Sequence, residues 1–198
     1  MRIKSRWFNE GREKTPQELA GAMAFVIWRI GDNALKNTRK ANFEIAIGTQ
    51  YFAFLSEFLV FLIQVADRIA YRQLEPEVRF AFTSALANRV AETLAENQSR
   101  LMASNASDDK QQFINKLNQR ADEYAEFDYG SEEANFSFLR YLGYCIHEVV
   151  DEKDATWIVD QMMSIAAPDA VAMVEKTMRE LFETEPRQPR VRKSSSGD

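Results

Sequence analysis

The most informative feature of this chain is the segment from 42 to 74, in which apolar residues fill most positions. At about 100° per residue, its polar side chains fall within a strip of roughly 80°, and apolar side chains occupy the remaining circumference. A helix with this pattern requires other elements on nearly every side. We therefore predict that it lies at the centre of an all-α fold. The polar positions of the strip are Gln50, Glu57, Gln64, Arg68 and Arg72.

The flanking sequence predicts further amphipathic helices. Thr15, Pro16 and Glu18 match a capping box with proline at the first helical position, and the helix that follows should end near 38–41. The other helices that we expect run from 76 to about 102, from Ser107 as cap to about 127, from Ser131 as cap to about 150, through a short segment around Trp157 to Ile165, and from Pro168 onward.

These helices predict one domain. We expect a single all-α bundle of about six or seven helices over 15–185, with a basic N-terminal tail at 1–14 and a disordered, basic, serine-rich C-terminal tail at 186–198. A chain of 198 residues with 45% hydrophobic residues and 14 phenylalanines is long enough to bury a sizeable core. Seven glycines and five prolines are few for a fold of strands and tight turns.

Charge is distributed unevenly along the chain. Five basic and two acidic residues give 1–14 a net charge of +3, four basic residues and one acidic residue give 186–198 +3, and the net charge of −5 therefore leaves −11 on 15–185. An acidic body repels polyanions, which argues against nucleic-acid binding. The simplest interpretation of the basic tails is that they aid solubility.

The single cysteine excludes an internal disulfide and any zinc site built on cysteines. Cys145 lies in a dense apolar run, which indicates a buried packing thiol. It is two residues from His147, so the two side chains point in different directions on a helix and do not form a catalytic pair. The first residues lack the apolar core of a secretory signal, and we expect a cytoplasmic protein.

Metal and catalytic motifs are weak. One histidine rules out a ferritin-like di-iron site, which needs two Glu-x-x-His motifs. His147 and Asp151 are four residues apart and are weak candidates for a metal site, although they suit the polar end of a helix equally well. A haem pocket around the lone imidazole has only the phenylalanine content in its favour. We find no nucleophile elbow or phosphate loop, and expect no cofactor and no catalytic residues.

The polar strip of Gln50, Glu57, Gln64 and Arg68, with Asp67 beside it, has two interpretations. The one that we favour here is the thin solvent face of a mostly buried helix. The alternative is a polar seam inside the bundle, in which Glu57 pairs with an arginine of another helix around a ligand. The choice decides whether the strip is a surface or a site.

A membrane-spanning interpretation of the same segment is weaker. Between 43 and 66 the only charged residues are Glu44 and Glu57, and these 24 residues exceed the roughly 20 that span a bilayer. Glu57 near the midpoint would cost on the order of a few kcal/mol. We expect a core helix of a soluble protein, with peripheral membrane contact as the lesser alternative.

We find no family whose motifs map onto this chain, so function is inferred from class alone. The first hypothesis is a non-enzymatic helical interaction, assembly or adaptor protein that forms a homodimer or binds a protein partner. The second is a carrier or sensor that binds an apolar small molecule or lipid inside the bundle. The candidate ligand-binding residues are Phe54, Phe58, Phe61 and Tyr144 around a cavity, with Glu57, Gln64, Asp67 and Arg68 orienting a polar head group.

Overall fold

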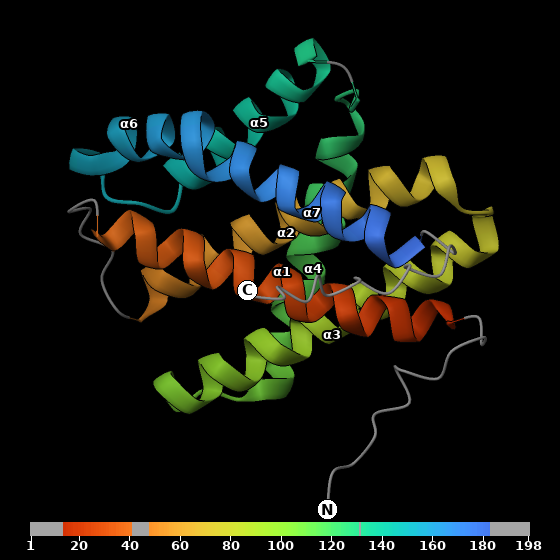
Figure 1. Ribbon diagram of the computed structural model, residues 1–198. Helices are drawn as coiled ribbons and strands as arrows, with labels where there is room; N and C mark the ends of the chain where they lie inside the picture. The colour runs from red at the N-terminus through yellow and green to blue at the C-terminus, as the bar shows by residue number, and fades with distance from the viewer. Residues whose placement is uncertain (1–13, 41–47, 131, 183–198) are drawn as a thin grey trace, which may run out of the picture.

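The computed structural model describes residues 14–40, 48–130 and 132–182, and helices connected by short turns make up these ranges (Figure 1). The all-α prediction is confirmed. The elements are α1 (Pro16–Lys40), α2 (Thr49–Gln73), α3 (Pro76–Met102), α4 (Ala106–Ala125), α5 (Glu132–His147), α6 (Glu152–Gln161), the π-helical turn η2 (Met162–Ala166) and α7 (Ala167–Phe182).

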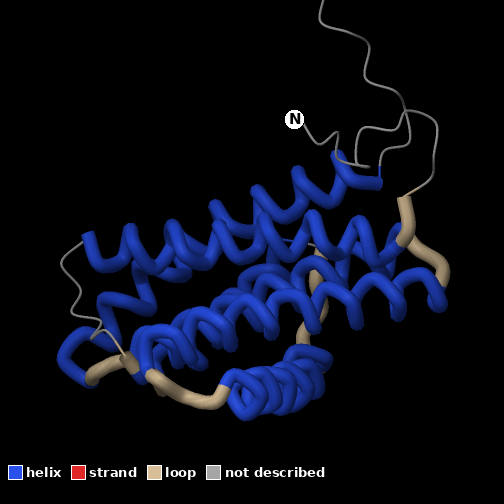
Figure 2. The backbone as a smooth tube through the Cα atoms, turned by 90° about the horizontal axis from the view of Figure 1, so that it is seen from below, coloured by secondary structure: helices blue, strands red, loops and turns tan. Residues whose placement is uncertain are grey.

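Helix α2 contributes more of the core than a typical amphipathic helix does. Sixteen of its 25 residues are buried, and it packs against α1, α3, α4, α5 and α7. Figure 1 shows α5 and α6 on one side of α2, with α1 and α3 toward the other, and Figure 2 shows the helices side by side from below. The predicted start of this helix, at 42, lies outside the described residues.

Helix α1 begins with the predicted capping box. The backbone N–H of Glu18 donates to Thr15 Oγ1 at 3.2 Å, and the backbone N–H of Thr15 donates to Glu18 Oε2 at 3.0 Å. Farther along α1, Gly31 allows close approach to α2. A Cβ atom at this position would lie 3.0 Å from Leu59 and 3.2 Å from Leu55, so the glycine fits the packing of the two helices.

The turn between α3 and α4 corrects one prediction. We expected Ser107 to cap α4, whereas Asn105 is the cap, and its side chain accepts a hydrogen bond from the Ser107 N–H at 2.9 Å. Both residue types are good caps, and α4 begins two residues earlier than predicted, shortly after Ala103, which adopts a left-handed conformation with φ of 54°. The predicted cap Ser131 of α5 lies outside the described residues.

A second correction concerns Pro168. We expected it to open a separate last helix, but α6, η2 and α7 form one continuous helical run across it. A proline inside a helix removes one backbone hydrogen bond and displaces the carbonyl four residues earlier. The wider π-helical turn just before Pro168 absorbs this displacement without ending the helix.

Aromatic rings connect the core of α2 to α4 and α5. The ring of Phe58 lies between those of Phe54 and Phe61, at centroid distances of 6.4 and 6.0 Å, and the ring of Phe61 contacts that of Phe138 of α5 at 5.8 Å. Tyr124 of α4 packs on Phe138 at 4.5 Å. These rings are fully buried, and they fix α4 and α5 relative to α2.

Candidate interaction groove

A surface groove of about 690 Å³ lies between the end of α4, helix α5 and the α6–η2 segment. Its lining is mostly aromatic and apolar, with an arginine, a histidine and a glutamate as its ionisable groups. The residues that line it are Phe127, Ser137, Arg140, Tyr141, Gly143, Tyr144, His147, Glu148, Val159 and Met163. We call this feature the α5 groove.

The sequence of α5 explains why this helix has a buried side and an open side. Phe138, Leu142, Cys145 and Ile146 recur at helical spacing and are buried against the core. Tyr144 lies on the opposite side and is 56% exposed. The apolar residues of α5 are therefore divided between the core and the surface.

Gly143 brings the second wall of the groove close. A Cβ atom at this position would lie 3.1 Å from both Met163 Sδ and Val159 Cγ1. Only a glycine lets the backbone of α5 approach α6 and η2 at this distance without displacing those side chains. The narrow base of the groove thus depends on a residue without a side chain.

A buried ion-pair network lies behind the groove. Glu57 of α2 is 3% exposed, and its carboxylate accepts two hydrogen bonds from Arg120, at 3.0 and 3.1 Å, and one from Lys116 at 2.9 Å. Both cations belong to α4. The desolvated carboxylate is stabilised by a bidentate pair with a planar guanidinium, which is the geometry in which buried charge is tolerated best.

The network continues from α4 to the groove wall. Arg120 Nη1 donates to Glu123 Oε2 at 2.8 Å and to the hydroxyl of Tyr141 at 2.9 Å, and that hydroxyl in turn donates to Glu123. The phenol of Tyr141 is thus held at both its donor and its acceptor. The ring of Tyr141 stacks on the rings of Phe127 and Tyr144, at centroid distances of 5.2 and 6.1 Å. The aromatic wall of the groove is therefore fixed from behind by charged groups.

Burial keeps the two tyrosine hydroxyls and the cysteine thiol near this network protonated. Burial raises the pKa of Tyr141, and its hydrogen bond to Glu123 raises that pKa further. Burial also raises the pKa of Tyr124, whose hydroxyl has no hydrogen-bond partner within the described ranges. Burial raises the pKa of Cys145 to about 11, so the thiol is protonated at neutral pH and is a poor nucleophile.

The Tyr141→Phe variant tests the contact between the network and the groove wall. Burial raises the pKa of Glu123, but hydrogen bonds from Tyr141 and Arg120 lower it by more, so its folded-state pKa is below the ordinary value. A carboxyl group whose pKa is lower in the folded state stabilises the fold fully above its unfolded-state pKa, which is about 4.3 for glutamate. This stabilisation is lost as the pH falls through the folded-state pKa.

We therefore expect Tyr141→Phe to lower the free energy of unfolding by about 1 kcal/mol at pH 7, the scale of one partly exposed hydrogen bond to a charged group. The deficit should shrink below about pH 4 as Glu123 becomes protonated. Urea unfolding of both proteins at pH 7 and pH 3.5 measures it. An equal deficit at both pH values would show that the phenol does not act through Glu123.

The middle of the predicted polar strip lies inside the bundle, whereas Arg72 at its end is exposed. The interpretation as a solvent face is wrong for Glu57 and Gln64, which are both buried. Arg68 donates to the backbone carbonyls of Tyr124 and Phe127, at 2.9 and 3.3 Å, and so satisfies the C-terminal end of α4 beside the groove.

Two further candidate residues line a different groove. Gln64 and Asp67 border a depression of about 460 Å³ between α2, α3 and α4, where Asp67 accepts hydrogen bonds from Arg79 at 2.9 Å and from Thr83 at 2.7 Å. The structure thus does not place them with Glu57 around one head-group site.

The candidate aromatic residues are joined by ring contacts rather than arranged around one cavity. Phe54, Phe58 and Phe61 pack against one another in the core, whereas Tyr144 lies at the surface. The contact path from Phe61 runs through Tyr124 and Tyr141, so the four predicted residues mark the two ends of one aromatic cluster.

His147 and Asp151 do not form a cluster with further ligands. Both are exposed, and His147 lines the groove with its Nδ1 4.0 Å from Glu148. Across the described ranges, no group of three or more His, Cys, Asp or Glu side chains has the spacing of a metal site. Among the helices in these ranges, none combines the length and apolar character that crossing a bilayer requires.

Sequence reasoning missed the α4 side of the network. Lys116, Arg120 and Glu123 are spaced four and three residues apart, which puts them on one side of a helix. This spacing can be read from the sequence, but it does not show that Glu57 of α2 lies opposite. Comparison with known proteins adds no assignment: no family model, no curated protein and no solved structure matches this chain.

Proposed function

We propose that this chain is a non-enzymatic helical interaction protein, and that the α5 groove with the exposed side of α5 is its contact surface. The observation that carries the proposal is an aromatic surface that is fixed by hydrogen bonds to partly buried charged groups. Tyr141, half-buried, is fixed by Arg120 and Glu123, and Tyr144 continues its stack into solvent. Preorganised aromatic side chains are the groups that dominate binding energy at protein interfaces.

The composition of the groove fits a protein partner. Tyrosine, phenylalanine, methionine and arginine are enriched at interface cores, and Tyr144, Phe127, Met163 and Arg140 supply one of each in this groove. The acidic net charge of −5 favours a protein partner over nucleic acid. The free, buried thiol of Cys145 agrees with a cytoplasmic setting, which is part of the proposal.

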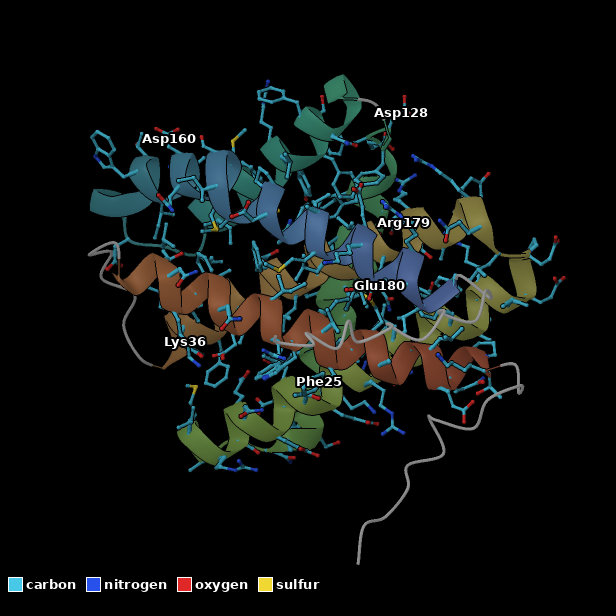
Figure 3. All side chains as sticks on the ribbon, viewed as in Figure 1. Phe25, Lys36, Asp128, Asp160, Arg179 and Glu180 are labelled. Carbon is cyan, nitrogen blue, oxygen red and sulfur yellow. The ribbon has the colours of Figure 1, made fainter. Side chains whose placement is uncertain are left out.

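Affinity capture from a lysate of the source cells tests this surface. We expect Tyr144→Glu to lose the partners that the wild-type protein retains, because it buries a charge in the contact. Phe25→Glu is the matched control, since Phe25 is 62% exposed on α1 and lies away from α5 in Figure 3. Circular dichroism melts check that both variants are folded. Equal capture by wild type and Tyr144→Glu would contradict the proposal.

A second candidate is a carrier or sensor for an apolar molecule, now placed in the α5 groove rather than inside the bundle. The volume of the α5 groove supports this candidate, because about 690 Å³ lies within the range of small-molecule sites. Native mass spectrometry separates the two: extra mass that is lost on denaturation supports the carrier, and an integral multiple of 22.8 kDa supports the interaction protein.

A further inference from the structure

Four residues at intervals of four form a ridge along the exposed side of α5. Phe136 is 57% exposed and Tyr144 is 56% exposed, and the charged residues Arg140 and Glu148 are exposed as well. Residues four apart lie on one side of a helix. Glu148 belongs to this row because its backbone N–H donates to the Tyr144 carbonyl at 3.2 Å, which continues the helical pattern past the end of α5. We call this row the α5 ridge.

The two charges of the ridge have no strong partner in the described part of the fold. Arg140 makes no ion pair or hydrogen bond with another described residue, and its helical neighbours Phe136, Ser137, Gly143 and Tyr144 carry no carboxylate. Glu148 has one contact, at 4.0 Å, with the exposed imidazole of His147. Arg140 and Glu148 are eight residues apart, about 12 Å along a helix, which is too far for them to pair with each other.

This order of residues is complementary to itself. Tyr144 lies midway between Arg140 and Glu148, four residues from each. If two α5 helices cross antiparallel with a two-fold axis at Tyr144, then Arg140 of each copy lies opposite Glu148 of the other. An interface around a two-fold axis uses the same patch on both copies, so each pair of opposite charges occurs twice.

We propose that the α5 ridge is the contact surface of a homodimer, in which two copies pair antiparallel through Tyr144 and exchange Arg140–Glu148 ion pairs. This inference rests on the proposed function and names the partner of that same surface as a second copy of this chain. The ridge is an i, i+4 row, and such rows pack into one another in the commonest class of helix crossing, at about −50°.

The α5 groove runs beside the ridge, and side chains of the second copy can pack into it where the two helices cross. Tyr144 and Arg140 belong both to the ridge and to the groove lining, together with the Gly143 backbone and Met163. The tyrosine of the second copy enters this space beside the Tyr141 ring. A single helix crossing buries less surface than a standard interface, so the dimer is reversible and its dissociation constant is on the order of micromolar.

Charge reversal tests the pairing directly. Sedimentation velocity of the full chain over a range of concentrations gives the dissociation constant for wild type, Arg140→Glu, Glu148→Arg and the double variant. Each single variant places like charges opposite each other twice, and we expect its dissociation constant to rise at least about tenfold. The double variant restores opposite charges and should return to within about threefold of wild type.

Arg179→Glu is the matched control, because Arg179 is an exposed arginine on α7 and its reversal should leave the constant unchanged (Figure 3). All three substituted positions are exposed, so folding is retained. A wild type that stays monomeric at several hundred micromolar overturns the dimer, as does a double variant as weak as the singles. If Tyr144→Glu nevertheless loses captured partners, the proposed function stands and only the second copy is wrong.

Discussion

Phe61→Ala is expected to lower the free energy of unfolding by about 4 kcal/mol, the middle of the range for removing a buried phenylalanine from a packed core. Phe61 has no exposed surface, and its ring contacts Phe58, Tyr124 and Phe138 at centroid distances of 6.0, 6.4 and 5.8 Å. The cavity removes contacts to α2, α4 and α5 at once. Chemical denaturation monitored by circular dichroism measures the change.

The matched control for that variant is Phe80→Ala, since Phe80 is 76% exposed at the start of α3. We expect it to change the free energy of unfolding by less than about 0.5 kcal/mol. If the Phe61 variant lost no more than the Phe80 variant, the aromatic cluster would not be the junction between α2, α4 and α5.

Glu57→Ala is the second large effect, and we expect a loss of about 3 kcal/mol. The substitution leaves Arg120, which is largely buried, without its bidentate partner, and leaves Lys116 facing the same space. Removing one member of a buried ion pair is far more costly than the net value of the pair, because the remaining charge stays desolvated. The residual bond from Arg120 to Glu123 reduces the cost, so the expected value is at the lower end of the range.

Glu92→Ala provides the comparison for that measurement. Glu92 on α3 also pairs with one lysine and one arginine, Lys110 at 3.1 Å and Arg89 at 3.4 Å, but its side chain is 42% exposed. We expect a loss below about 1 kcal/mol, because exposed ion pairs are screened by water. Similar losses for Glu57→Ala and Glu92→Ala would mean that the Glu57 network is not desolvated in solution.

The helices could be predicted because their signals are local. The Thr15–Glu18 capping box and the proline at the start of α3 each act within one turn, and both are found where the sequence places them. The errors at Ser107 and Pro168 are also local in origin. Two good caps lie within three residues of each other in the first case, and a π-helical turn accommodates the proline in the second.

The candidate site was harder to predict because its contacts join distant residues. Glu57 is 59 residues from Lys116 and 63 from Arg120, so a polar strip on α2 has the same pattern whether water or α4 covers it. The same ambiguity affected α5, where Phe136 and Tyr144 fit an apolar run but are exposed. Periodicity gives the direction of a side chain on its helix, whereas the packing of helices decides what covers it.

The contacts between α2, α4 and α5 form one continuous support for the surface. Glu57 and Arg120 connect α2 to α4, Glu123 and Tyr141 connect α4 to α5, and the ring of Tyr144 continues this support to the surface. We infer that buried charge here serves to hold an aromatic surface in a fixed shape. A fixed surface loses little conformational entropy on binding, and this makes the free energy of binding more favourable.

Hydroxyl-radical footprinting of Tyr144 is the most direct test of the claim that the exposed side of α5 is the contact surface. The measurement compares the oxidation rate of Tyr144 with that of Tyr71, a 67% exposed tyrosine at the end of α2, in dilute protein, in concentrated protein and in a lysate of the source cells. We predict that Tyr144 becomes protected in the concentrated protein or the lysate while Tyr71 does not. Equal and unchanged oxidation of both tyrosines under all three conditions would contradict the account.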